Sequence, residues 1–412
     1  MIQDFILENR KVTARFLELT RRVQPSLRVV HHNDADGIAA AAALSTAFKQ
    51  LGLTHRLIPV EKIYEPLVEK VHTGTGDILL YADLGGQSSS LIGRYASGNL
   101  LVVILDHHLP GGPVPDNVIH LNPERFNISG DNDASGASVC ALFARELLSA
   151  GGLDGPDETA WLAALGVIGA VGDGQELNGA FTGLNELLFS EAVKAGMIQK
   201  DGSSLVLPRM RGMTVEEIVE VLTLLGSVGF YSGDAASAKA LLMGENTDDA
   251  LRRAGHLGEI KKTCFAGEMA RIRQAGLERS EHFQWINVQD RFAPMGVKAI
   301  GLFLEELIAH EIAAKENYLV GFQHLPAEAP GIGGFDTALS KISTRVHPEL
   351  RRSIEEGKLP DFMSLVPGAT ALVKGIADGC HRFAAGSLID RGLEEDFIRA
   401  LEKVLSQHSG TF

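Results

Sequence analysis

"VVHHNDADGIAAAA", residues 29–42, places two histidines and two aspartates directly after a run of β-branched residues. Together with Leu27 and Arg28, that run is typical of a short buried strand, and the alanines after Gly37 continue as a helix. Ionisable groups at the end of a buried strand need partners, because an isolated charge is costly to bury. Divalent metal ions are partners of this kind. The stretch therefore predicts a strand, a turn and a helix that present metal ligands where the strand ends.

Three further apolar runs have the character of strands, and helical patterns lie between them. The runs are "DILLYADLG" (77–85), "NLLVVILDHHLP" (99–110) and "NVIHLNP" (117–123). Strands that alternate with helices predict a parallel sheet with helices on both faces, in which ligands bind at the carboxyl ends of the strands. The fold class is therefore α/β, with the charged residues gathered at one edge of the sheet.

The length of 412 residues predicts more than one domain. Residues 1–196 carry the strand and helix alternation and form the predicted N-terminal catalytic domain. Residues 197–280 show helical patterns without obvious strands and predict a helical connector. Strand patterns such as "HFQWINVQD" return in residues 281–412, which predict a second, smaller α/β domain. We expect a two-lobed molecule with the active site in the cleft.

Composition and charge argue against several classes of protein. The chain has 52 acidic and 38 basic residues, and its net charge of −14 argues against a protein that binds nucleic acid through its overall field. Three widely spaced cysteines form no CxxC pair, which argues against a disulfide framework and a zinc–thiolate site. The N-terminus lacks the apolar core of a signal peptide, and no stretch reaches the ~18 apolar residues of a membrane span. We expect a cytoplasmic protein.

The acidic and histidine residues at the strand ends form one candidate site. They are His31, His32, Asp34, Asp36, Asp83, Asp106, His107, His108 and, in "GAVGDGQ", Asp173. Each aspartate alone could be a helix N-cap or a turn residue, and only the whole set is specific. Such a mixed set predicts two divalent ions, with Mn²⁺ favoured and Mg²⁺ as the alternative. Only one of His31 and His32 should face the site, because successive strand residues point to opposite faces.

Four of these segments, in order along the chain, resemble the motifs of the DHH phosphoesterase superfamily. They are "HNDADG", "YADLG", "LDHH" and "GAVGDGQ". Two later segments, "STRV" and "GCHRFAAGS", resemble the DHH-associated C-terminal domain of the RecJ type. The resemblance covers most of residues 28–390. It is strongest to archaeal RecJ-like nucleases, including those named for association with the GINS replication complex.

The resemblance implies a role for each matching residue. One metal ion would be held by His32, Asp34 and Asp83. The other would be held by Asp36, Asp83, His107 and Asp173, with Asp83 as the bridge. Asp106 would orient the histidines, His108 would touch the scissile phosphate, and His31 would be structural. Ser343, Arg345 and His381 match positions that bind the substrate phosphate or a terminal nucleotide.

One position departs from the family pattern. The C-terminal loop of the family usually carries consecutive glycines before its histidine, whereas this chain has Gly379-Cys380-His381. A side chain at Cys380 would interfere with backbone amides that approach a phosphate. The alternative interpretation is a small buried residue beside an intact site.

The resemblance implies a metal-dependent phosphodiesterase, a RecJ-like exonuclease that hydrolyses single-stranded DNA or RNA from an end with a water activated by two metal ions. We expect no counterpart of the additional OB-fold domain of bacterial RecJ, and residues 281–412 contain more acidic than basic residues. Short oligonucleotides, or strands delivered by a GINS-type partner, are therefore the expected substrates. The alternatives are a phosphodiesterase of small substrates (nano-RNA, a cyclic dinucleotide or 3′-phosphoadenosine 5′-phosphate) and a catalytically silent replication-complex adaptor.

Overall fold

The structure is a computed structural model that describes residues 1–177 and 179–408. The chain divides into two compact units. The first contains Met1–Gly226, Gly233–Gly255 and Pro330–Ile332, and the second contains the other described residues. Within the described ranges, no helix combines the length and the apolar composition that crossing a membrane requires.

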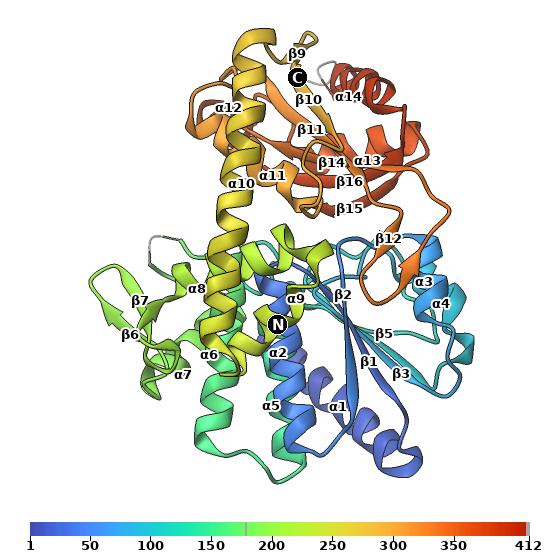
Figure 1. The fold of residues 1–412 in the computed structure, drawn as a ribbon. Coiled ribbons are helices and arrows are strands. Elements are labelled where there is room, and N and C mark those ends of the chain that lie inside the picture. The colour runs from blue at the N-terminus through green and yellow to red at the C-terminus, as the bar shows by residue number, and fades with distance from the viewer. Residues whose placement is uncertain (178, 409–412) are drawn as a thin grey trace. The chain divides into compact units, whose positions relative to one another are not determined.

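The first unit is built on a five-stranded parallel sheet with the strand order β2-β1-β3-β4-β5 (Figure 1). Its strands are β1 (Leu27–His32), β2 (His55–Val60), β3 (Ile78–Ala82), β4 (Leu101–Leu105) and β5 (Ile119–Leu121). Every residue of β3 and β4 is buried, as expected for parallel strands that are covered on both faces. All five strands end at the same edge of the sheet. The predicted α/β fold with a parallel sheet is confirmed.

Strand β2 was not among the predicted strands. Its sequence, "HRLIPV", has no continuous apolar run, and Pro59 within it argues against a central strand. In the structure β2 is an edge strand that pairs only with β1. An edge position tolerates proline because one side of the strand needs no hydrogen-bond donors.

Helix α2 (Ala35–Gln50) is the central helix of the first unit. It packs against β1 and against α5 (Gly136–Ala150) and α6 (Pro156–Gly172). The alanines of residues 39–43 are fully buried, and their small side chains allow these close approaches. The other helices before residue 196 are α1 (Ile2–Val23), α3 (Glu65–Val71), α4 (Ser89–Tyr95) and α7 (Gly183–Lys194).

The segment 197–280 is not helical throughout, so the expectation of helices alone was wrong. It begins with a small antiparallel sheet of β6 (Gln199–Asp201), β7 (Ser204–Leu207) and β8 (Met213–Thr214). The hairpin between β6 and β7 turns at Gly202, whose φ of 61° is left-handed. The two-residue loop is Gly202-Ser203, and these strands were too short to show a periodic pattern.

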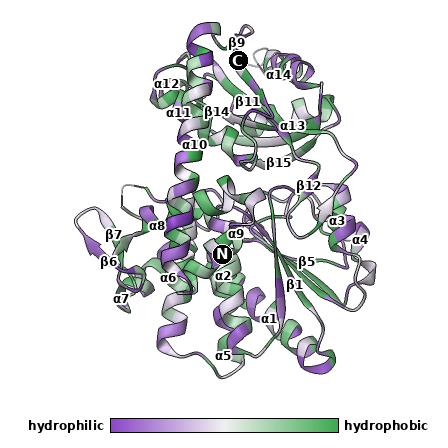
Figure 2. Cartoon of the chain, viewed as in Figure 1, coloured by the Kyte–Doolittle hydropathy of each residue, from purple (hydrophilic) through white to green (hydrophobic). Residues whose placement is uncertain are grey.

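Helices follow this small sheet. They are α8 (Val215–Thr223), a π-helical turn (Leu224–Val228), α9 (Ala235–Leu242) and α10 (Thr247–Ala275). Helix α10 is one continuous helix of 29 residues, in line with the helical patterns predicted for this segment. Hydrophilic and hydrophobic residues alternate along α10 in Figure 2. Its residues up to Gly255 belong to the first unit and the rest to the second.

The second unit contains a mixed six-stranded sheet with the order β15-β16-β14-β11-β10-β9. Only β10 and β11 pair in parallel. The strands are β9 (Glu278–Arg279), β10 (Phe283–Gln289), β11 (Tyr318–Leu325), β14 (Leu339–Arg345), β15 (Ile376–Cys380) and β16 (Ala385–Asp390). The two-residue strands β12 (Glu328–Ala329) and β13 (Gly333–Gly334) form a separate ribbon. The helices are α11 (Lys298–Ala309), α12 (Pro348–Glu355), α13 (Phe362–Leu372) and α14 (Glu394–His408).

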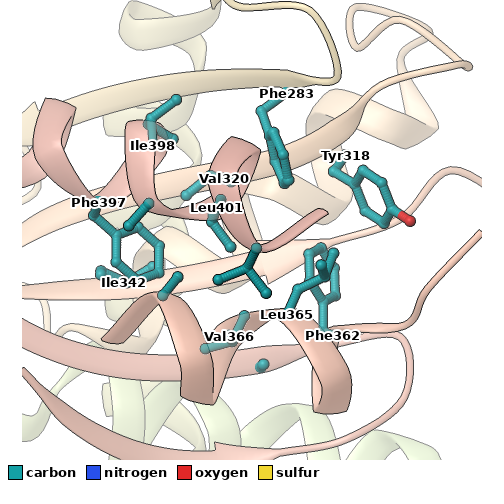
Figure 3. Close-up of a cluster of buried hydrophobic side chains, with 14 of the residues drawn as sticks. Phe283, Tyr318, Val320, Ile342, Phe362, Leu365, Val366, Phe397, Ile398 and Leu401 are labelled. Carbon is teal, nitrogen blue, oxygen red and sulfur yellow. The ribbon is translucent and has the colours of Figure 1, made fainter. Parts of the chain in front are cut away.

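A hydrophobic cluster holds α13 and α14 to this sheet (Figure 3). Phe397 of α14 packs edge-to-face against Phe322 of β11, with ring centroids 6.2 Å apart. Phe283, Tyr318 and Phe362 form a second aromatic contact within the same cluster. The second unit therefore has its own hydrophobic core, as the predicted separate domain requires.

Because Phe397 is fully buried in this core, Phe397→Ala should lower the free energy of unfolding of the second unit by about 3–5 kcal/mol. Chemical denaturation of the full chain, with hydrogen exchange of α14 as the local readout, measures the loss. Leu372→Ala, at a side chain that is 50% exposed, is the matched control and should change little. Equal effects of the two substitutions would contradict this account of the core.

Candidate metal centre

The first group of predicted ligands lies where β1 meets α2. Asp34 is the N-cap of α2, and its Oδ1 accepts a hydrogen bond from the Gly37 N–H at 3.0 Å. The other oxygen, Oδ2, lies 2.8 Å from Nδ1 of His32. A Cβ at Gly37 would lie 2.5 Å from the carbonyl oxygen of His32, so only glycine allows this close turn. The turn therefore brings the side chains of His32 and Asp34 together.

His31 does not belong to this group. Its side chain is buried, and its Nδ1 lies 2.8 Å from the carbonyl oxygen of its neighbour His32. Burial lowers the pKa of His31 to about 4, so the ring is neutral at neutral pH. The alternation of strand side chains separates the two histidines, in line with the prediction that only one faces the site.

Asp83 occupies the centre of the site. It follows β3 in the left-handed conformation, with φ of 61°, which aspartate tolerates better than most residues. Its Oδ2 lies 3.6 Å from Nδ1 of His32, and its Oδ1 lies 3.3 Å from Nε2 of His107. Among the described residues, none donates a hydrogen bond to the buried Oδ1. Burial, and next the charge of Asp36, raise the pKa of Asp83 well above its ordinary value.

Asp36 lies in the first turn of α2 and is held by the N-terminus of another helix. Its Oδ2 and Oδ1 accept hydrogen bonds from the N–H groups of Gly136 (2.7 Å) and Ala137 (2.8 Å) at the start of α5. A helix N-terminus stabilises negative charge, which offsets part of the cost of burying this carboxylate. Burial, and next the charge of Asp173, still raise its pKa.

His107 follows β4 and points one ring nitrogen at the carboxylates. Its Nδ1 lies 2.7 Å from the carbonyl oxygen of Gly130, which can only accept, so Nδ1 carries the proton. Its Nε2 lies within 3.3–3.8 Å of the carboxylates of Asp83, Asp173 and Asp36. Burial alone would lower the pKa of His107, but Asp173 and then Asp36 raise it to about 9.

Asp106 contacts both of the histidines that follow it in the chain. Its Oδ1 accepts a hydrogen bond from the N–H of His107 at 2.8 Å and lies 2.8 Å from Nδ1 of His108. Its Oδ2 accepts a hydrogen bond from the N–H of Gly86 at 2.7 Å. Burial opposes ionisation, but the charge of His108 holds the pKa of Asp106 well below its ordinary value. These contacts suit the predicted orienting role of Asp106.

Asp173 is the C-cap of α6, and a left-handed glycine follows it. Gly174, with φ of 69°, ends the helix in a Schellman motif, in which the Gln175 N–H donates to Ala170 O at 2.9 Å. This arrangement points the carboxylate of Asp173 toward Nε2 of His107, at 3.7 Å. The Asp173 side chain is 23% exposed, more than the other carboxylates of the site.

The structure brings all the predicted metal-binding residues together in overlapping groups. In each group the candidate ligand atoms lie within 4.8 Å of one another. The groups are His32, Asp34 and Asp83; Asp36, His107 and Asp173; and Asp83, Asp106, His107 and His108. The described residues form no other such group. The assignment of each residue to one ion or the other stays a prediction.

Sequence reasoning missed a pair of polar residues at the end of β5. Asn122 donates a hydrogen bond from Nδ2 to the carbonyl oxygen of His108 at 2.8 Å. The same Nδ2 lies 3.1 Å from Nε2 of His120, which is buried. The segment "HLN" was a polar strand end like the others, but it contained no carboxylate. The pair supports the backbone of the loop that carries His108.

The predicted substrate-binding residues lie in the second unit. Ser343 and Arg345 lie on the same face of β14, beside Gly301 of α11, where an added Cβ would be 3.0 Å from Nη2 of Arg345 and 3.4 Å from Oγ of Ser343. The Nε of Arg345 donates to Glu305 at 2.8 Å. His381 follows β15, which is separated from β14 by β16. Because β14 and β15 both pair antiparallel with β16, His381 lies at the same edge of the sheet as Ser343 and Arg345, one strand away.

Cys380 is the residue that departs from the family pattern. Its side chain is buried in the hydrophobic cluster of the second unit. Its backbone pairs with Ala385 of β16. This position agrees with the alternative interpretation of Cys380 as a small buried residue.

A metal-free form of the protein should lose stability as the pH rises, because the pKa of His107 is raised from 6.5 to about 9. The stabilising charge on His107 is fully present below pH 6.5 and is lost as the pH rises through about 9. We expect the Tm, measured by calorimetry in a chelator, to fall over this window. His107→Gln should give a flatter profile, and equal slopes for both proteins would contradict the prediction.

His31 and His32 should differ in their effect on metal binding. His32→Ala removes a candidate ligand and should weaken Mn²⁺ binding by at least about 10-fold, whereas His31→Ala should leave it near the wild-type value. Calorimetric titration of Mn²⁺ into the metal-free protein measures both. Equal losses of affinity would show that the two histidines are not divided in this way.

Part of the chain matches the model of a known family. Residues 26–167 match the family described as "DHH family, N-terminal domain". A curated relative, the uncharacterized protein MJ0831 of Methanocaldococcus jannaschii, is 29% identical over 192 residues, which are 45% of this chain and 41% of that protein. The chain thus matches less than half the length of that relative.

Solved structures share the fold over nearly the whole chain. A crystal structure of exonuclease RecJ bound to manganese has a TM-score of 0.60 at 18% identity and covers 97% of this chain and 94% of its own. RecJ of Thermus thermophilus in complex with Mn²⁺ has a TM-score of 0.62 at 18% identity, with 97% and 55% covered. The chain therefore has a RecJ-like fold, and residues 26–167, which match the DHH family, contain buried aspartates and histidines that suit a divalent metal ion.

Proposed function

We propose that this chain is a metal-dependent phosphodiesterase, a RecJ-like exonuclease that removes nucleotides from an end of single-stranded DNA or RNA. The observation that carries the proposal is the convergence of two aspartate–histidine groups on Asp83 at the carboxyl edge of a parallel sheet. Ligands of open α/β sheets bind at this edge. The match of residues 26–167 to the DHH family supports the same class of chemistry.

The donor set fits two divalent ions. Carboxylate oxygens suit hard cations, and the imidazoles of His32 and His107 move the preference toward Mn²⁺. No described residue donates a hydrogen bond to the buried Oδ1 of Asp83. Burial, and next the repulsion among the carboxylates, raise the pKa of Asp83, and a cation bound at this oxygen would offset that repulsion. One ion would be held by His32, Asp34 and Asp83, and the other by Asp36, Asp83, His107 and Asp173. Two bound ions supply Lewis-acid stabilisation of a phosphoryl group and a lowered pKa of water.

His108 is the candidate for contact with the substrate phosphate. Nδ1 of His108 lies 2.8 Å from Oδ1 of Asp106, which holds the ring beside the metal-binding residues. Burial disfavours the charged ring, but the charge of Asp106 outweighs it and raises the pKa of His108. A protonated ring donates a charge-assisted hydrogen bond to a phosphate oxygen, which is the stronger kind.

Arg345 and Ser343 are the candidates for binding a substrate phosphate in the second unit. A guanidinium group pairs bidentately with phosphate, and Gly301 leaves room beside Nη2 of Arg345. The chain has a net charge of −14, so its affinity for nucleic acid would depend on a few such contacts. Short single strands, or longer ones delivered by a GINS-type partner, are the substrates that these properties favour.

The test is turnover of single-stranded DNA and RNA, each labelled at one end, with and without Mn²⁺. Asp83→Ala and Asp173→Ala should lower the rate by more than about 100-fold, because ligand losses should exceed the 10–100-fold typical of outer-shell losses. Asp248→Ala, at an exposed aspartate paired with Arg211, is the matched control and should keep the wild-type rate. Full activity of Asp83→Ala would refute the assignment of the site.

A substrate panel separates the alternatives. Nano-RNA, a cyclic dinucleotide and 3′-phosphoadenosine 5′-phosphate are assayed beside single strands of four and of about 30 nucleotides. Stepwise release of nucleotides from one end supports the exonuclease. Hydrolysis of the small substrates alone would favour a small-substrate phosphodiesterase. No Mn²⁺-dependent turnover of any substrate would favour a catalytically silent adaptor.

A further inference from the structure

Two buried amides lie behind the metal-binding residues of the first unit. Gln175 is 2% exposed and Asn185 is fully buried. Neither amide is a candidate metal ligand, yet their side-chain hydrogen bonds connect them to Asp173 and to the backbone segments that hold Asp36 and His107. We infer that Gln175 and Asn185 are positioning residues that hold these three side chains in one geometry for a divalent metal ion.

Gln175 links Asp173 to His107. Its Nε2 donates to Oδ2 of Asp173 at 2.8 Å and to the carbonyl oxygen of Gly130 at 2.8 Å. The same carbonyl oxygen accepts the hydrogen bond from Nδ1 of His107 at 2.7 Å. His107 follows β4 and Asp173 follows α6, so one amide group joins residues from separate elements.

Asn185 of α7 connects Gln175 to the segment that holds Asp36. Its Nδ2 donates to Oε1 of Gln175 at 2.7 Å. Its Oδ1 accepts hydrogen bonds from the Ser135 N–H (3.2 Å) and from Oγ of Ser138 (2.6 Å). Ser135 is the N-cap of α5, and the next two N–H groups of that helix bind the carboxylate of Asp36. The network therefore reaches all three members of one candidate metal group.

Only one orientation of each amide group satisfies the hydrogen bonds of this network. The Ser135 N–H can only donate, so Asn185 must present Oδ1 to it and Nδ2 to Gln175. Gln175 must then turn Oε1 toward Asn185 and Nε2 toward Gly130 and Asp173. The backbone N–H of the N-cap residue Ser135 thus sets the direction of the hydrogen bond that Asp173 receives.

The hydrogen bond from Gln175 should affect the orientation of Asp173 more than the network affects Asp36 or His107. Its side chain is the most exposed of the three and projects from a helix end. Groups that orient metal ligands typically change metal affinity 10–100-fold when they are removed. The inference rests on the metal-binding part of the proposed function and does not depend on which phosphodiester is the substrate.

The experiment is a calorimetric titration of Mn²⁺ into the metal-free full chain, with no substrate present. Gln175→Ala should weaken one of the two binding events by about 10–100-fold and leave the other within about twofold. His32→Ala should weaken the other event, because His32 belongs to the other group. If the wild type binds no Mn²⁺, the metal-dependent function and the inference fail together.

Two variants distinguish positioning from packing. Gln284→Ala removes a fully buried glutamine of the second unit that binds Ala314 through both amide atoms, and it should lower the Tm without changing Mn²⁺ affinity. Asn185→Asp keeps an acceptor for Ser135 and Ser138 but loses the donor to Gln175. It should weaken the same Mn²⁺ binding event as Gln175→Ala.

The inference is overturned if Gln175→Ala lowers the Tm but leaves both Mn²⁺ affinities unchanged, as Gln284→Ala should. It is also overturned if Gln175→Ala weakens both binding events equally, because that pattern indicates general damage to the unit. Wild-type affinity in Asn185→Asp would show that Asn185 acts only as a cap for α5 and would overturn its assigned role.

Discussion

Mutual repulsion among buried carboxylates is the constraint on which the first unit depends. Asp34, Asp36, Asp83 and Asp106 are buried within one site, and Asp173 lies beside them. Backbone N–H groups offset part of this repulsion at Asp36 and Asp106, where the donors lie 2.7–2.8 Å from the carboxylate oxygens. Asp83 has no such help at Oδ1 from the described residues. Repulsion among these carboxylates therefore lowers the stability of the unit, and a bound cation would restore it.

Close backbone approach is the second requirement of the site. A Cβ at Gly136 would lie 2.4 Å from Oδ1 of Asp83, and one at Gly169 would lie 2.1 Å from Oδ1 of Asp36. Both glycines belong to helices that pack on the alanine-rich α2. The small residues of these helices therefore serve the site as well as the core, because larger side chains would hold α5 and α6 away from the carboxylates.

Much of the fold was predictable because its signals are local. Strands β3 and β4 are continuous apolar runs, β1 contains the apolar pair Val29 and Val30, and each strand leads directly into residues of the site. Elements without a clear pattern were missed or misjudged: the edge strand β2 contains Pro59, and the hairpin of β6 and β7 is too short to show a period.

For the site, the sequence by itself determined which carboxylates and imidazoles converge, because residues at the ends of parallel strands must meet at one edge. Only the tertiary structure decided how they are held. Gln175, Asn185 and Asn122 carry no charge, and their hydrogen bonds join segments far apart along the chain, such as Ser135 and Asn185, which are 50 residues apart. Neutral amides leave no pattern along the chain, because their role depends on the direction of hydrogen bonds that exist only once α5, α6 and α7 are packed together.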